Sequence, residues 1–204
     1  MYKLCKSEQS AIRQRELEHL LLSIMNTTRY EDISVSDFCA QAGIPRKAFY
    51  RYFSSKDGAL HALIDHTLLE VESFPTTLWL GSSKSQQKEL VRFFRFWQEQ
   101  KPLLDALEKS GISGVLVTRT IDYVLSDVGA ADKSPAGNML VRQYATTFGV
   151  CGFMSMVLSW HQNGYETTPE EMAQIASIML TAPLIRQKES ATKEVLQWNP
   201  KSKI

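Results

Sequence analysis

The chain has 204 residues, of which 44% are hydrophobic and 22% charged, and its formal net charge is +1 at pH 7. These values are ordinary for a globular protein and exclude a disordered or fibrous chain. Residues 1–60 carry nine Lys and Arg against seven Asp and Glu, residues 61–185 carry nine against thirteen, and residues 186–204 carry five against two. A mildly basic N-terminal segment followed by an acidic central region is compatible with an N-terminal segment that binds an anionic partner such as nucleic acid.

The cysteines and the N-terminus indicate where the protein works. Cys5, Cys39 and Cys151 are odd in number and form no C-x-x-C pair, which argues against a disulfide framework and for a reducing compartment. The N-terminus lacks the apolar core of a secretory signal. Residues 143–165 contain no charged side chain, but polar residues interrupt this stretch, so we interpret it as a buried helix rather than a membrane span. We therefore expect a cytoplasmic protein with no membrane partner.

The first half of the chain is predicted to be helical, because its apolar residues follow helical spacing and no stretch alternates long enough to indicate a strand. Ser34 or Ser36 is expected to cap the second helix and Gly43 to end it. Pro45 is expected to open the third, since its missing N–H is not needed in a first turn. Helices are predicted over about 8–27, 34–43, 45–53 and 56–74, with a break at 28–32.

The second half is also predicted to be helical, which makes the expected fold class all-α. Gly164 is expected to end one long helix, and Thr168 with Glu171 has the spacing of a capping box for the next. Helices are predicted over about 87–100, 102–111, 113–128, 138–163 and 168–186, with loops at 82–87 and 129–137. We expect an N-terminal helix-turn-helix domain over 1–74, a larger helical domain over 75–186, and a polar basic tail over 187–204.

Residues 43–56, GIPRKAFYRYFSSK, combine four basic and four aromatic residues with no acid. Two short helices joined by a tight turn and preceded by a third helix have helix-turn-helix geometry. A helical wheel of the second short helix places Arg46, Lys47, Tyr50 and Arg51 outward. Arg can bind guanine in a bidentate manner, and Lys and Tyr can bind phosphate oxygens. This outward set therefore suits DNA, and a solvated charged face is the alternative.

The remaining aromatic residues of this segment are expected to point inward. The same wheel places Phe49 on the opposite side, and Phe53 and much of Tyr52 follow it. Phe38 and Ile44 are plausible neighbours for them. The aromatic residues are thus divided between a small core and the outer face.

The segment 34–64, SVSDFCAQAGIPRKAFYRYFSSKDGALHALI, resembles the DNA-binding region of TetR-type transcriptional regulators. The resemblance rests on the helix-capping residue, the turn Gly43, the Tyr-x-x-Phe pair Tyr50 and Phe53, and Lys56 at the start of the fourth helix, and it extends over about residues 8–70. In that family the third helix of this region enters the major groove. The joint spacing of these residues is much more specific than any one of them.

The resemblance implies roles for individual residues. It implies Tyr50 and Lys56 on phosphates, Arg46 at a base edge, and Lys47 and Ala48 near the DNA. Two departures stand beside it, since Ala48 lies where many relatives have Thr, and Pro45 where a capping Ser or Thr is usual.

Two serines at the start of the second helix also match positions that often touch flanking phosphates. These residues are Ser34 and Ser36. Pure helix capping is an equally good explanation for both.

The larger half contains none of the common catalytic motifs, so we predict no catalytic residues, no metal and no cofactor. Its helices are rich in aromatic residues and Met, which suits a pocket for a small apolar or aromatic molecule, as the resemblance also implies. Plain core packing is the alternative for each residue. The predicted pocket residues are Phe94, Trp97, Tyr123, Phe148, Phe153 and Trp160.

The two last predicted helices offer a candidate dimer face. Small residues recur along the first of them at spacings of four and three, and Gly inside a helix costs about 1 kcal/mol relative to Ala, so it indicates a packing reason. The resemblance implies a four-helix bundle across a twofold axis, with packing inside one chain as the alternative. The predicted interface residues are Ala145, Gly149, Gly152, Met156, Ser159, Ile175, Ile178, Met179 and Ala182.

The residues and the resemblance together predict a homodimeric, sequence-specific transcriptional regulator. It is expected to bind a near-palindromic double-stranded operator, and to act as a repressor that a small apolar or aromatic effector releases. A coactivator or adaptor of the same fold, whose larger domain binds a protein partner, is the alternative. An α-helical enzyme ranks last.

Overall fold

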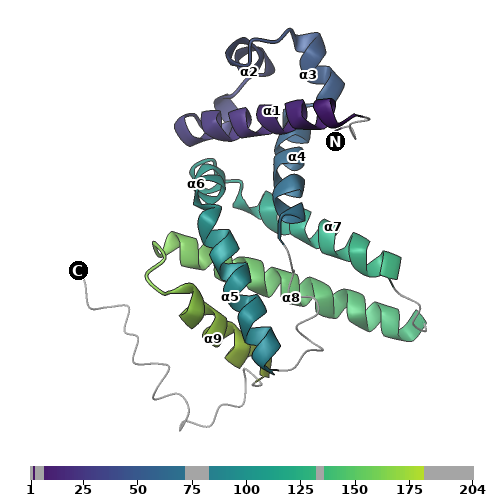
Figure 1. The fold of residues 1–204 in the computed structure, drawn as a ribbon, viewed down its shortest axis with the longest axis vertical. Helices are drawn as coiled ribbons and strands as arrows, with labels where there is room; N and C mark the ends of the chain where they lie inside the picture. The colour runs from purple at the N-terminus through teal and green to yellow at the C-terminus, as the bar shows by residue number, and fades with distance from the viewer. Residues whose placement is uncertain (1, 3–6, 72–82, 132–135, 182–204) are drawn as a thin grey trace.

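The computed structural model describes Tyr2 and residues 7–71, 83–131 and 136–181. In these residues it contains α-helices, one 3-10 turn and no strand, which confirms the predicted all-α class (Figure 1). The helices are α1 (Glu8–Thr27), α2 (Val35–Gln41), α3 (Arg46–Tyr52), α4 (Lys56–Leu69), α5 (Ser83–Glu99), α6 (Lys101–Lys109), α7 (Ser113–Ala131), α8 (Ala136–Gln162) and α9 (Pro169–Thr181), with the 3-10 turn η1 (Tyr30–Asp32) between α1 and α2.

Helices α1 to α4 form a head at one end of the molecule (Figure 1). The predicted inward aromatic residues are confirmed there: Phe38, Phe49 and Phe53 are each at most 2% exposed, and Tyr52 is half-buried. The ring of Phe49 meets the ring of Phe38 at a centroid distance of 5.5 Å and that of Phe53 at 5.2 Å. This small aromatic core holds α3 against α2 and fixes which side of α3 faces outward.

Helices α5 to α9 form the body, in which α5 packs along α9 and α7 packs along α8. Large rings fill the centre, since Phe93, Phe94 and Trp97 of α5 are at most 2% exposed. They interlock with α8: Phe94 meets Trp160 at 5.7 Å and Phe93 meets Phe153 at 5.7 Å, both edge to face. Edge-to-face pairs of this kind stabilise beyond the area that they bury.

Three specific contacts join the head to the body. The buried backbone N–H of Tyr30 donates to Ser110 Oγ at 3.0 Å, and Lys109 Nζ donates to the carbonyl of Asn26 at 3.1 Å. The third contact is a bidentate ion pair between Arg119 of α7 and Asp65 of α4, in which Arg119 Nε lies 2.8 Å from Asp65 Oδ1. The Asp65 carboxylate raises the pKa of the Arg119 guanidinium. The head is thus attached at the end of α1 and along α4.

Two predicted loops are wrong in extent. Helix α5 begins at Ser83, inside the predicted loop 82–87, because this stretch contains no Gly or Pro after Gly81 and its Lys and Gln are good helix formers. Helix α7 continues to Ala131 and α8 begins at Ala136, which shortens the predicted loop 129–137 at both ends. A single Gly next to Ala residues is too weak a signal to predict the end of a helix. The described helix α9 ends at Thr181, and the predicted continuation to 186 lies outside the described residues.

The predicted helix caps are confirmed by their hydrogen bonds. Ser34, rather than Ser36, caps α2 by accepting the N–H of Asp37 at 3.0 Å. Thr168 and Glu171 form the reciprocal capping box of α9, in which the Thr168 N–H donates to the Glu171 carboxylate at 2.8 Å and the Glu171 N–H donates to Thr168 Oγ1 at 3.2 Å. Each cap satisfies backbone donors that a helix start leaves unpaired.

The cap of α4 supports a stability prediction. Ser55 Oγ accepts the N–H of Gly58 at 3.0 Å, so Ser55→Ala should lower the free energy of unfolding by about 1 kcal/mol. Ser126→Ala is the matched control, because the exposed Ser126 lies inside α7 and its hydroxyl donates to the carbonyl of Tyr123 in the same helix. Urea unfolding followed by circular dichroism at one protein concentration measures both. Equal losses in the two variants would contradict the capping role of Ser55.

No helix in the described part of the chain is long and apolar enough to cross a membrane.

Candidate nucleic-acid interface

The turn between α2 and α3 is built by local backbone chemistry. Gly43 adopts a φ of +62°, in the left-handed region, and no atom lies within 4 Å of where its Cβ would be, so conformation rather than space requires glycine. The N–H of Ile44 donates to the carbonyl of Cys39 at 3.0 Å and closes the turn. Pro45 precedes α3 and provides no side-chain cap. The sharp turn sets α3 at an angle to α2, as a helix-turn-helix requires.

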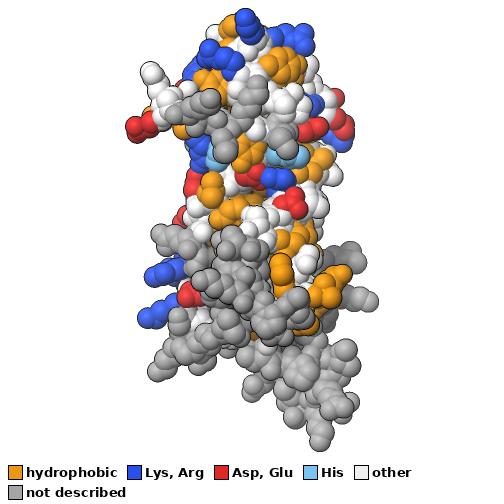
Figure 2. All heavy atoms as spheres, turned by 90° about the vertical axis from the view of Figure 1, so that its right-hand side faces the viewer, with side chains coloured by type: hydrophobic (Ala, Val, Ile, Leu, Met, Phe, Trp, Pro, Cys, Tyr) orange, Lys and Arg blue, Asp and Glu red, His pale blue; other side chains and the backbone are white. Residues whose placement is uncertain are grey.

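The four residues predicted to face outward are all exposed: Arg46, Lys47, Tyr50 and Arg51. Tyr50 is 41% exposed, and its ring packs edge to face against the ring of Phe49 at a centroid distance of 5.4 Å. This contact holds the Tyr50 side chain in place. The first turn of α3 contains no acid. Figure 2 shows Lys and Arg side chains gathered at the end of the molecule that the head forms. The outer side of α3 is therefore a basic surface with a rigidly held Tyr.

Three other residues predicted near DNA are uncharged, and the two serines among them are exposed. Ser34 Oγ is already bonded to the N–H and the carboxylate of Asp37. Ser36 is exposed on the first turn of α2, and Ala48 is half-buried on the side of α3. Ser34 therefore has a structural role that accounts for its residue type, whereas the DNA contacts of Ser36 and Ala48 stay predictions.

Lys56 has a structural role that the sequence did not reveal. Its ammonium donates to the carbonyls of Tyr30 at 2.7 Å and Glu31 at 3.3 Å, and it lies 4.4 Å from the centre of the Tyr30 ring. The hydroxyl of Tyr30 in turn donates to Asp57 at 2.6 Å, and burial raises the pKa of that hydroxyl. Lys56 thus ties the start of α4 to η1. One of its three N–H donors remains for the predicted phosphate contact.

The six side chains of the predicted effector pocket do not surround one cavity. Phe94, Trp97, Phe153 and Trp160 are at most 6% exposed and pack in the aromatic core of the body, which is the alternative weighed for them. Tyr123 is half-buried on α7. Their packing leaves no described space between the rings for a ligand.

Phe148, the sixth residue of that set, lies on the surface with 71% of its area exposed. It lines a small apolar cleft of about 150 Å³ together with Phe153, a second residue of that set, and with Gly149, Gly152, Met156 and Met179 of the predicted dimer face. Because apolar and polar residues alternate around all sides of α8, its sequence could not show which side is buried. Two of the six predicted pocket residues, Phe148 and Phe153, thus share a cleft that lies along the predicted dimer face.

The remaining residues of the predicted dimer face lie on α8 and α9. Ala145, Ser159 and Ile175 are exposed, and Ile178 is half-buried. Ala182 lies outside the described residues. Exposed apolar side chains extend this surface toward the start of α8, and we call the extended set the α8 apolar face: Leu140, Val141, Tyr144, Phe148, Ile175 and Met179, which are 37–71% exposed.

Within the described residues, no group of three or more His, Cys, Asp or Glu side chains lies close enough together to hold a metal ion.

Comparison with known families assigns both parts of the chain to one class of protein. Residues 27–63 match the family described as bacterial regulatory proteins, tetR family, and residues 86–182 match the one described as transcriptional regulator C-terminal region. Together the two matches cover more than half of the chain. The first contains the turn at Gly43 and all of α3, and the second contains most of the body.

Individual relatives agree with this assignment. The HTH-type transcriptional regulator EthR of Mycolicibacterium smegmatis is 40% identical over 50 residues, which cover 24% of this chain and 23% of that protein, so the match spans about a quarter of the relative's length. Among solved structures, the dihydroxyacetone kinase operon activator DhaS has a TM-score of 0.52 at 17% identity, covering 83% of this chain and 94% of that one. The fatty acid degradation regulator FadR from Bacillus halodurans has a TM-score of 0.51 at 11% identity, covering 90% and 100%. At these identities the structures show a shared fold alone.

Proposed function

Because the chain belongs to the TetR family of DNA-binding transcriptional regulators, we propose that it is a homodimeric, sequence-specific repressor that reads its operator with α3. The observation that carries this proposal is the outer side of α3, where Arg46, Lys47, Tyr50 and Arg51 are exposed over a rigid aromatic core. Phosphate contacts would position the helix in a major groove and base-edge contacts would supply specificity. Because it would bind DNA, the protein would act in the cytoplasm.

The α8 apolar face supports the dimer. Apolar side chains as large as Tyr144 and Phe148 stand exposed side by side on one helix, and a monomer rarely exposes a contiguous apolar surface of this kind. A second copy of the chain, related by a twofold axis, would bury the same residues on both sides. Two α3 helices related by that axis require an operator with near-palindromic half-sites, about one turn apart or more.

A small effector would control the repressor through the contacts between head and body. The joints at Ser110 and at Asp65–Arg119 transmit any shift of α6 or α7 to the head. A ligand that binds better to one arrangement of the two heads would shift the population toward that arrangement. Release of the operator would follow when the favoured spacing no longer fits the half-sites.

Selection of bound duplexes from random DNA tests the proposal directly. The purified full chain is incubated with the pool at near-physiological salt, and the retained duplexes are sequenced over several rounds. We expect an inverted repeat, because a symmetric dimer reads each half-site in the same way. Weak retention without sequence preference and with steep salt dependence would show that α3 is only a phosphate-binding surface. In that case the exposed α8 apolar face would favour an adaptor that binds a protein partner.

The selected operator also tests the assignment of Arg46. Arg46→Ala should relax the preference at one base pair in each half-site by about 1–3 kcal/mol, because a bidentate contact to a base edge is lost. Lys47→Ala is the matched control from the same exposed turn, and it should weaken binding to all duplexes alike by removing a phosphate contact. Fluorescence anisotropy against single-base operator variants measures both. An unchanged preference in Arg46→Ala would remove this residue from the base-reading set.

A further inference from the structure

Tyr2, which precedes α1, contacts both α3 and α4. Its backbone forms an antiparallel bridge with that of Phe53, the residue at which α3 ends. Its ring packs on its edge against the ring of His66 on α4, at a centroid distance of 5.5 Å. Its hydroxyl is hydrogen-bonded to the carboxylate of Asp65, which also lies on α4. Tyr2 therefore joins the end of α3 to α4 while belonging to neither helix.

The contacts of Tyr2 are partly withdrawn from water. Its side chain is half-buried and packs against the hydrophobic core. Burial, the charge of Asp65 and the hydrogen bond to it raise the pKa of Tyr2 to about 12, so the hydroxyl keeps its proton and donates at neutral pH. Asp65 also accepts from Arg119 Nε at 2.8 Å. The Tyr2 hydroxyl thus shares its acceptor with the ion pair that joins α4 to α7.

Helix α3 depends on contacts with its neighbours. It is seven residues long and its start has no side-chain cap, and so short a helix is not stable on its own in water. Its start is joined to α2 by the turn at Gly43 and by the packing of Phe49 on Phe38 at 5.5 Å. Its end is joined to Tyr2 through the backbone of Phe53. The two ends of α3 are therefore held by different partners.

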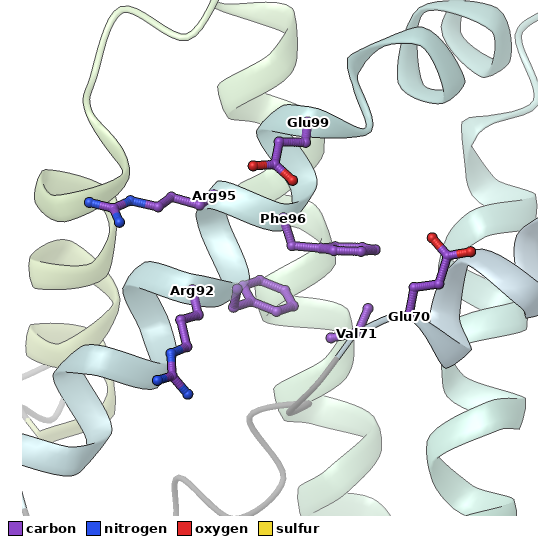
Figure 3. A pocket seen from close by; sticks show the side chains of 7 residues that line it. Glu70, Val71, Arg92, Arg95, Phe96 and Glu99 are labelled. Atoms are coloured by element: carbon purple, nitrogen blue, oxygen red, sulfur yellow. The ribbon is translucent and has the colours of Figure 1, made fainter.

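Helix α4 gives Tyr2 a fixed support, because α1 binds α4 through other residues. His66 Nδ1 lies 2.8 Å from Oε2 of Glu18, a fully buried carboxylate of α1. Arg15 of α1 forms an ion pair with Glu70, the residue that follows α4 (Figure 3). Loss of the Tyr2 side chain would leave both contacts in place. It would therefore loosen the end of α3 while α4 stays packed on α1.

We propose that Tyr2 is a positioning residue for the reading of DNA: by holding the end of α3 against α4, it sets the angle at which the outer side of α3 meets the base edges. This inference rests on the proposed function, in which α3 reads the operator. Hydrogen bonds to base edges require close alignment of donor and acceptor. Attraction to phosphates depends mainly on charge. A loosened α3 would therefore lose affinity for the operator and keep its affinity for unrelated DNA.

Amide hydrogen exchange of the free chain tests whether Tyr2 holds α3, without any DNA. Tyr2→Ala removes the ring and the hydroxyl, whereas Tyr2→Phe removes the hydroxyl alone. Exchange in α3 should become about tenfold faster in Tyr2→Ala and change less in Tyr2→Phe, while α9 exchanges as in the wild type. Unchanged exchange in α3 of Tyr2→Ala would overturn the inference, whatever DNA the chain binds.

Fluorescence anisotropy against the selected operator and a duplex of scrambled sequence tests the effect on DNA reading. Tyr2→Ala should lower the affinity for the operator about tenfold and change the affinity for the scrambled duplex less than about twofold. Tyr2→Phe should recover most of the operator affinity, because the ring still packs against His66. Equal losses on both duplexes would overturn the positioning role, since a smaller folded fraction lowers both affinities alike.

A variant in the body controls for a general loss of stability. Thr168→Ala removes the cap of α9 and so destabilises the body without changing the head. It should keep the wild-type ratio of operator affinity to scrambled-duplex affinity. A fall of this ratio equal to that in Tyr2→Ala would show that stability alone is measured, and would overturn the inference.

The two proposals fail in different ways. A wild-type chain that selects no inverted repeat would refute the proposed function, and with it the role of Tyr2 in DNA reading. If the wild type selects an inverted repeat and Tyr2→Ala binds the operator and the scrambled duplex with an unchanged ratio, this inference is wrong and the repressor proposal stands.

Discussion

Replacing Phe148 with Glu should raise the dissociation constant of the proposed dimer by about a thousandfold. Phe148 is the most exposed member of the α8 apolar face, at 71%, and a symmetric dimer would contain it twice, so each substitution would act twice. Burying one Phe side chain contributes about 2 kcal/mol, and two lost contacts therefore amount to about 4 kcal/mol before any charge repulsion is counted. Sedimentation velocity over a range of protein concentrations measures the change.

A matched control distinguishes the dimer from a general effect of adding charge. Leu69 is 62% exposed at the end of α4 and does not belong to the α8 apolar face, so Leu69→Glu makes the same kind of change outside the proposed interface. It should sediment as the wild type does. Circular dichroism should show native helicity in both variants, because neither side chain is buried in the monomer. If Phe148→Glu sediments like Leu69→Glu, the dimer uses another surface.

Replacing Asp65 with Asn should lower the free energy of unfolding by about 3 kcal/mol. Asp65 is 9% exposed and accepts two hydrogen bonds from Arg119, so the substitution leaves a partly buried guanidinium without its carboxylate. Removing one partner of a buried pair costs much more than the pair contributes as a whole. The neighbouring hydroxyl of Tyr2, whose pKa burial and Asp65 raise to about 12, loses the same partner.

Arg119 provides the control for this prediction within the same site. Its other carboxylate neighbour, Asp122, is exposed and 3.4 Å away, so Asp122→Asn should cost less than about 1 kcal/mol. Urea unfolding at one fixed protein concentration compares the two variants, because the proposed dimerisation would make the apparent stability depend on concentration. Equal stability of Asp65→Asn and the wild type would show that the α4–α7 ion pair does not hold the head.

Local signals were sufficient for the head. The turn at Gly43, the position of Pro45 and the cap at Ser34 each act within a few residues, and they set the limits of α2 and α3. The inward place of Phe49 follows from the same short helix, since its period leaves little choice once the outer side is charged. Here local chemistry and tertiary packing agree, so the elements could be predicted.

The body was harder to predict because its signals are not local. Apolar and polar residues are spread around all sides of helix α8, so nothing in its sequence distinguished the exposed Phe148 from the buried Phe153. The joint between Asp65 and Arg119 connects residues 54 positions apart, which no periodicity reveals. The hydrogen bond from Lys56 to the Tyr30 carbonyl joins residues 26 positions apart, so no periodicity in the sequence could reveal it either. Cavities depend on how helices cross, so no local signal indicated the cavity of about 270 Å³ between Val71 and Phe96 (Figure 3).

The most direct test of the account is the number of chains bound to an inverted repeat and to the same duplex with one half-site scrambled. Native mass spectrometry gives the number of chains, and fluorescence anisotropy at fixed salt gives the two affinities. The account predicts two chains on each intact operator, one α3 in each half-site, and a large loss of affinity when one half-site is scrambled. A single chain on either duplex, bound equally well to both, would contradict a dimer that reads DNA through paired α3 helices.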